Sequence, residues 1–169
     1  MAEFSDLDEI WFVITPHNPH KKKKTLLEGH HRLAMVEIAV EDYPKLQASN
    51  VEFALPQPNY TVNTLAYLEE KYPKQNFCLI MGEDNLKSLH KWKNYEVILD
   101  RYSIYVYPRI SEGTVETQFN NHKKITKVDA PIIELSSTFI RKAIKSRKNV
   151  RPMLSPAVWK YLDEMNFYR

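Results

Sequence analysis

The sequence predicts an α/β fold built on a parallel sheet with helices on both faces. Short apolar runs alternate with segments of helical periodicity, which is the pattern of right-handed βαβ units. Several of these runs are continuous rather than alternating, as expected of strands that helices cover on both sides. At 169 residues, the chain matches one compact domain spanning residues 1–169.

Five short apolar runs are the expected strands. In chain order they span residues 10–15, 46–53, 77–81, 103–107 and 132–135. The polar stretch 111–124 is the one long loop that we expect.

Four helices are expected where apolar residues recur at helical spacing. They span residues 31–43, 60–72, 86–99 and 155–165. In the first of them, Leu33, Val36 and Val40 share one face. The last begins with Ser155 and Pro156, a common start signal for a helix.

The composition excludes several classes of protein. A hydrophobic content of 43% excludes disorder, and a net charge of +3 suits an anionic ligand but falls short of a dedicated nucleic-acid binder. The single cysteine, Cys78, cannot form an internal disulfide and indicates a reducing compartment. The apolar runs are too short to cross a bilayer and no signal stretch opens the chain, so we expect a cytoplasmic protein.

A candidate phosphate site follows the last expected strand. Ser136, Ser137 and Thr138 stand where the run 132–135 meets a helix, whose first turn leaves backbone N–H groups unpaired. Arg141 lies one turn further on and can reach an anion over the same helix end. The alternative is that these hydroxyl groups only cap the helix.

Seven motifs occur in a fixed order along the chain. They are residues 7–13, 19–21, 59–65, 80–84, Trp92, 136–141, and 154–158 with Tyr161. In this order they resemble the bacterial nicotinate-nucleotide adenylyltransferases. The resemblance implies a Rossmann-like nucleotidyltransferase fold that joins ATP to nicotinate mononucleotide, giving deamido-NAD and pyrophosphate, with Mg²⁺ accompanying the ATP.

One family motif has no counterpart. The signature G-x-F-x-P-x-H-x-G-H, whose histidines hold the ATP phosphates in that family, is absent, and Gly29-His30-His31 is interpreted as the start of a helix. We therefore expect the chain to begin inside the first helix, with residues 1–4 as its tail, so that the first βα unit is missing and the domain is N-terminally incomplete. In the family that strand lies at the centre of the sheet.

The resemblance also assigns the ATP site. Its members here are Gly82, Asp84, Ser136, Ser137, Thr138 and Arg141. Thr138 and Arg141 are the expected catalytic residues, acting on the phosphates. Asp84 follows Gly82 at the carboxyl end of a strand, where it can accept a hydrogen bond from a ribose hydroxyl or act as an ordinary helix cap.

The mononucleotide site is expected around five residues: His20, Lys21, Tyr60, Thr61 and Trp92. Trp92 offers an aromatic face for the nicotinate ring, unless it is only a core residue. Tyr60 and Thr61 begin a helix, with Asn59 as the expected cap, and can receive the nicotinate carboxylate. No metal site is expected, because the spacing of His17 and His20 has no further ligand at the distance that zinc requires.

Three functions remain open from the sequence. The favoured one is adenylyl transfer from ATP to nicotinate mononucleotide in NAD biosynthesis. The alternative is a catalytically impaired, nucleotide-binding remnant of the same fold, which the missing histidines favour. A basic RNA- or DNA-binding module depends only on residues 21–24 and scattered aromatic residues, so we expect neither nucleic acid nor membrane as a partner.

Overall fold

The computed structural model describes residues 1–16, 27–109 and 118–169. The strands of the described chain are β1 (Ile10–Val13), β2 (Leu46–Ser49), β3 (Leu79–Gly82), β4 (Ile104–Tyr107) and β5 (Ile125–Lys127). Its α-helices are α1 (Gly29–Val40), α2 (Thr61–Lys71), α3 (Glu83–Ser88), α4 (Tyr95–Arg101), α5 (Ser137–Lys145) and α6 (Pro156–Glu164). Short 3₁₀ turns are η2 (Val51–Phe53), η3 (Leu89–Lys91) and η4 (Arg151–Met153).

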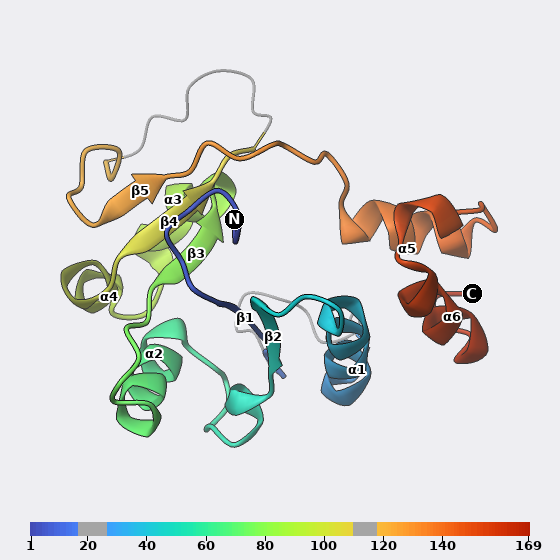
Figure 1. Ribbon diagram of the computed structural model, residues 1–169, viewed down its shortest axis with the longest axis horizontal. Helices are drawn as coiled ribbons and strands as arrows, with labels where there is room; N and C mark the ends of the chain where they lie inside the picture. Colours follow the sequence, from blue (N-terminus) through green and yellow to red (C-terminus); the bar gives the residue numbers. More distant parts are fainter. Residues whose placement is uncertain (17–26, 110–117) are drawn as a thin grey trace.

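Every strand pairing in the described chain is parallel, which confirms the predicted α/β class (Figure 1). The strands form two sheets, β1-β2 and β3-β4-β5. Among the described residues, β1 and β3 therefore each have a strand partner on one edge only. The sheets are connected near β1 by aromatic packing, where the Trp11 ring lies 5.1 Å from that of Tyr72 and 5.5 Å from that of Phe77.

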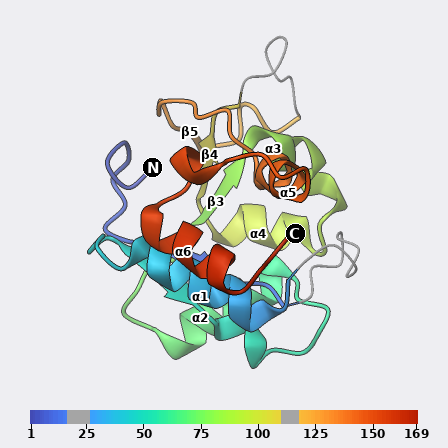
Figure 2. The same ribbon diagram turned by 90° about the vertical axis from the view of Figure 1, so that its right-hand side faces the viewer.

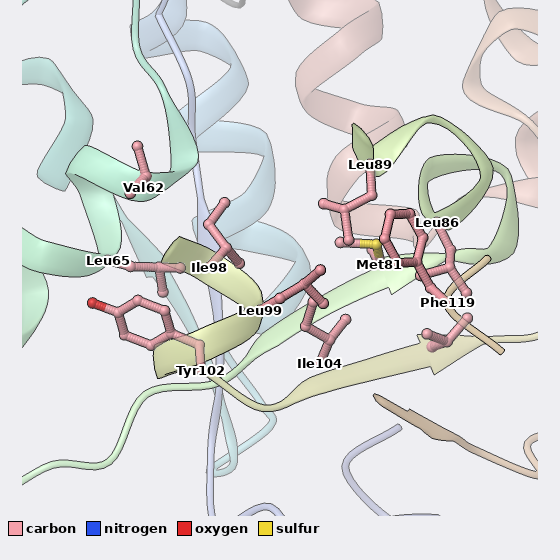
Figure 3. Close-up of a cluster of buried hydrophobic side chains, with 11 residues drawn as sticks. Val62, Leu65, Met81, Leu86, Leu89, Ile98, Leu99, Tyr102, Ile104 and Phe119 are labelled. Carbon is pink, nitrogen blue, oxygen red and sulfur yellow. The ribbon is translucent and has the colours of Figure 1, made fainter. Parts of the chain in front are cut away.

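The main hydrophobic core covers the β3-β4-β5 sheet (Figure 3). Leu86, Leu89, Ile98 and Ile104 are fully buried in it, and α2 contributes Val62 and Leu65. Helix α3 follows β3 directly and contacts both β3 and β4, so it lies at the carboxyl end of β3, where ligands bind in parallel α/β sheets.

The C-terminal helices form a unit of their own (Figure 1). Ala143, Ile144 and Val150 make a small separate core, and residues 129–136 connect it to β5 as an extended segment. Helix α6 packs across α1 (Figure 2). His31 Nδ1 and the Tyr161 hydroxyl share a hydrogen bond of 2.9 Å at this contact.

Three predicted elements differ from the structure. The expected strand 46–53 ends at Ser49, and Val51–Phe53 form η2 instead. The run 132–135 is not a strand, because it lies on the surface with Ile133 74% exposed and pairs with no described strand. The predicted helix 86–99 is broken into α3, η3 and α4, because Trp92 has an extended backbone and Asn94 is left-handed with φ of 51°. The sequence analysis also missed β5, whose three residues include a single apolar one.

In the described part of the chain, every helix is too short or too polar to cross a membrane.

Candidate functional site

The N-terminus of α5 carries the predicted phosphate residues. Ser136 is the N-cap, and its hydroxyl accepts a 3.1 Å hydrogen bond from the Phe139 amide. The guanidinium of Arg141 donates to Ser137 Oγ at 3.0 Å and to Thr138 Oγ1 at 3.1 Å. The structure therefore brings all four residues together, with the positive charge of Arg141 placed over the first turn of the helix.

Tyr168, which the sequence analysis did not single out, lies near both Arg141 and Arg32. Burial raises the pKa of its phenol, and the charges of Arg141 and Arg32 oppose this rise. Burial in turn lowers the pKa of Arg32. The guanidinium of Arg32 donates to the carbonyls of Thr15 at 2.8 Å and Leu27 at 3.0 Å, which fixes the end of β1 to the start of α1.

At the carboxyl end of β3, Gly82 precedes a pair of opposite charges. Asp84 Oδ1 lies 3.3 Å from Arg109 Nε, and Glu83 Oε2 accepts a 3.1 Å bond from the Arg109 amide. A Cβ atom at Gly82 would stand 2.5 Å from Asp84 Oδ1, so a larger residue would displace this carboxylate. Asp84 is not the helix cap, because Gly82 occupies that position. Arg109 was missed, since no local pattern marks a partner 25 residues away.

The N-terminus of α2 lies next to the main core. Tyr60 is its N-cap residue, so the prediction that Asn59 caps this helix is wrong. The Asn59 side chain instead donates a 3.1 Å hydrogen bond to the Glu52 carbonyl. The first backbone hydrogen bond of the helix is donated by the Asn63 amide to the Tyr60 carbonyl. Within the described chain, the amides of Thr61 and Val62 therefore remain available to an anion.

Trp92 follows η3 and is half-buried. Its side chain packs against the same core cluster as Tyr60, and Lys93 Nζ stands 4.4 Å from the centre of the Tyr60 ring. The structure thus places Trp92, Tyr60 and a positive charge in one region. Because it is half-buried, the Trp92 side chain packs on the core with one part and exposes another part.

His20 and Lys21 lie outside the described residues, as does His17. Among the described residues, no group of three His, Cys, Asp or Glu side chains is arranged to hold a metal ion.

A surface cavity of about 480 Å³ lies away from these residues. It is lined by α1 and the start of β2, including Glu37, Glu41 and Gln47. None of the candidate site residues in the described chain lines it.

The chain is similar to known proteins over nearly its whole length. The cytidylyltransferase-like family model matches residues 1–143. A probable nicotinate-nucleotide adenylyltransferase of Christiangramia forsetii is 68% identical over all 169 residues, which correspond to 87% of that protein. The relative of the same description from Flavobacterium psychrophilum is 63% identical over the whole chain and 88% of its own length.

A solved structure has the same fold. The Plasmodium falciparum nicotinic acid mononucleotide adenylyltransferase complexed with NaAD superposes with a TM-score of 0.78, over 95% of this chain and 82% of that one. At 21% sequence identity, the likeness establishes the fold alone.

Proposed function

The chain belongs to the nicotinate-nucleotide adenylyltransferases, enzymes of NAD biosynthesis with a cytidylyltransferase-like fold, and we propose that it transfers the adenylyl group of ATP to nicotinate mononucleotide. In this reaction a phosphate oxygen of the mononucleotide forms a bond to the α-phosphorus of ATP. The bond from that phosphorus to the bridging oxygen breaks, and pyrophosphate leaves. The products are deamido-NAD and pyrophosphate.

The cluster at α5 is the observation that carries this proposal. Ser136, Ser137, Thr138 and Arg141 gather hydroxyl donors and one guanidinium at a helix N-terminus, where developing phosphate charge is stabilised. Adenylyl transfer needs mainly positioning and charge neutralisation, so Arg141 and Thr138 are proposed to act on the phosphates. Gly82 and Asp84 are proposed to hold the ribose, with Asp84 exchanging Arg109 for a hydroxyl.

For the mononucleotide, we assign the nicotinate carboxylate to the helix start at Tyr60 and Thr61, where the amides of Thr61 and Val62 are free, and the ring to Trp92. His20 and Lys21 remain predicted contacts to its phosphate. Mg²⁺ is proposed to arrive with the ATP phosphates, as part of the substrate.

The test is pyrophosphate release by the purified chain with Mg²⁺, ATP and nicotinate mononucleotide. We expect turnover with the acid mononucleotide and much less with its amide, because the α2 amides and Lys93 favour a carboxylate. Activity on neither mononucleotide would contradict the proposal. ATP binding by calorimetry without pyrophosphate release would support the alternative, an impaired nucleotide-binding remnant.

A further inference from the structure

Glu52 is a buried carboxylate that the proposed reaction does not use. It lies in η2, directly after β2, and is 6% exposed. Its Oε1 accepts a 2.6 Å hydrogen bond from Thr64 Oγ1, while Oε2 is buried without a partner in the described structure. Burying a carboxylate with one unsatisfied oxygen costs folding free energy, so stability alone is a poor reason for this residue.

The contacts of Glu52 connect η2, where the loop before α2 begins, to the start of α2, where that loop ends. Its backbone carbonyl accepts from Asn59, and its carboxylate accepts from Thr64 in the first turns of α2. The Thr64 hydroxyl also lies 3.3 Å from the Tyr60 carbonyl, at the N-cap. Glu52 is therefore bonded on both sides of the helix start at Tyr60.

Apolar packing does not replace these bonds. Val62 and Leu65 fix the axis of α2 against the core, but between Phe53 and Pro58 no side chain is buried. The path of the chain into α2 is thus held by the polar contacts of Glu52 rather than by the hydrophobic core.

We propose that Glu52 is a positioning residue for the mononucleotide, which fixes the first turn of α2 so that its free amides meet the nicotinate carboxylate. This inference rests on the proposed function. It adds a role for a residue that touches neither substrate, and it acts through Thr64. Preorganised donors bind an anion without reordering the loop, so loosening the tether weakens mononucleotide binding and leaves ATP binding unaffected.

The experiment compares Thr64→Val, which removes the hydroxyl and keeps the shape, with Thr64→Ser, which keeps the hydroxyl. Thr64→Val is expected to raise KM for nicotinate mononucleotide about 10-fold and KM for ATP less than about 2-fold, as loss of a bond to a charged group implies. Thr64→Ser is expected to stay near wild type. Thr126→Val, the same change at an exposed position of β5, is the matched control.

Two further measurements complete the test. Glu52→Leu, which removes both carboxylate oxygens, is expected to change KM for the mononucleotide less in the Thr64→Val background than in wild type, since either change alone already removes the Glu52–Thr64 bond. Amide exchange at residues 61–63 is expected to accelerate in Thr64→Val. If Thr64→Val raises KM for the mononucleotide and KM for ATP equally, or leaves amide exchange unchanged, the positioning role is overturned. Turnover by the wild-type chain would still uphold the proposed function in that case. A wild-type chain that neither binds nor converts the mononucleotide would overturn both.

Discussion

Both terminal nitrogens of the Arg141 guanidinium donate hydrogen bonds within its own helix, α5. Its bonds to Ser137 and Thr138 hold the side chain over the N-terminal turn of α5. If ATP binds there as proposed, its phosphates accept from the same donors, whose positions are already set before the ligand arrives.

We expect Arg141→Ala to weaken ATP binding or turnover by about 2 to 4 kcal/mol, because a charge-assisted contact is lost from a preorganised site. Steady-state kinetics with varied ATP measure this effect. Lys145→Ala is the control, since it removes the same charge at the other end of α5. Wild-type kinetics in Arg141→Ala would exclude the residue from the ATP site.

Trp92→Ala is expected to raise KM for the mononucleotide more than KM for ATP, by about 1 to 3 kcal/mol for a lost stacking face. Trp92→Phe keeps an aromatic face and should retain most of the binding. If Trp92→Ala changes both KM values equally, then the side chain serves the core and not the substrate.

Ionisation of Tyr102 is expected to make the free energy of unfolding fall at alkaline pH. Burial, together with a 2.8 Å hydrogen bond to Glu69, raises the pKa of its phenol from 10.0 to about 12. Because the phenol holds its proton more tightly in the folded state than in the unfolded state, it contributes stability that is fully present below pH 10. This contribution is lost as the pH rises through about 12. Urea unfolding between pH 8 and about 12 is expected to show that Tyr102→Phe is less stable at pH 8 by about 1 kcal/mol and loses less stability at high pH. Parallel curves for the two proteins would contradict this.

At the scale of elements, the sequence predicted most strands but not how they associate. Strands β1, β3 and β4 were located because continuous apolar runs mark strands of a parallel sheet, whereas β2 is only half apolar. The run 132–135 has the same composition yet lies exposed, since partner strands are not encoded locally. The clustering of Ser136, Ser137, Thr138 and Arg141 at the start of α5 was predictable because the four residues are close in sequence. Arg109 and Glu52 were not, because their partners are distant in the chain.

The docking of α6 on α1 also fixes where the α5 cluster lies. The extended segment 129–136 offers little packing, so the hydrogen bond of His31 with Tyr161 and the ring of Phe167, 4.7 Å from that of His31, hold the C-terminal unit.

We expect Tyr161→Phe to lower the free energy of unfolding by about 1 kcal/mol, because the hydrogen bond with His31 is lost. It is also expected to raise KM for ATP but not for the mononucleotide, because the proposed phosphate-binding residues at the start of α5 move with α6. Urea unfolding and kinetics measure the two effects. Tyr43→Phe, at a 58% exposed position, is the control. An unchanged KM for ATP would show that the docking does not position α5.

For the whole molecule, the main feature is the division into two parallel sheets. In the described chain, β1 and β3 each have one edge without a strand, and Phe12 of β1 is 43% exposed. Open strand edges with exposed apolar side chains favour association between chains.

The 169-residue chain is therefore expected to associate with rising concentration, and Phe12→Lys is expected to reduce the association. Sedimentation velocity over a range of concentrations measures both. Sedimentation coefficients that stay constant over the concentration range, or that are the same in Phe12→Lys, would contradict this expectation.

The contact between α1 and α6 has a consequence for how the chain folds during synthesis. The β3-β4-β5 core is built mainly from residues 60–128, which emerge consecutively, so it can form early. Helix α1 must instead await residues 156–164, made roughly 10 s later at ordinary rates of translation. During that interval the face of α1 that later meets α6 stays uncovered, because the residues that will cover it have not yet been made.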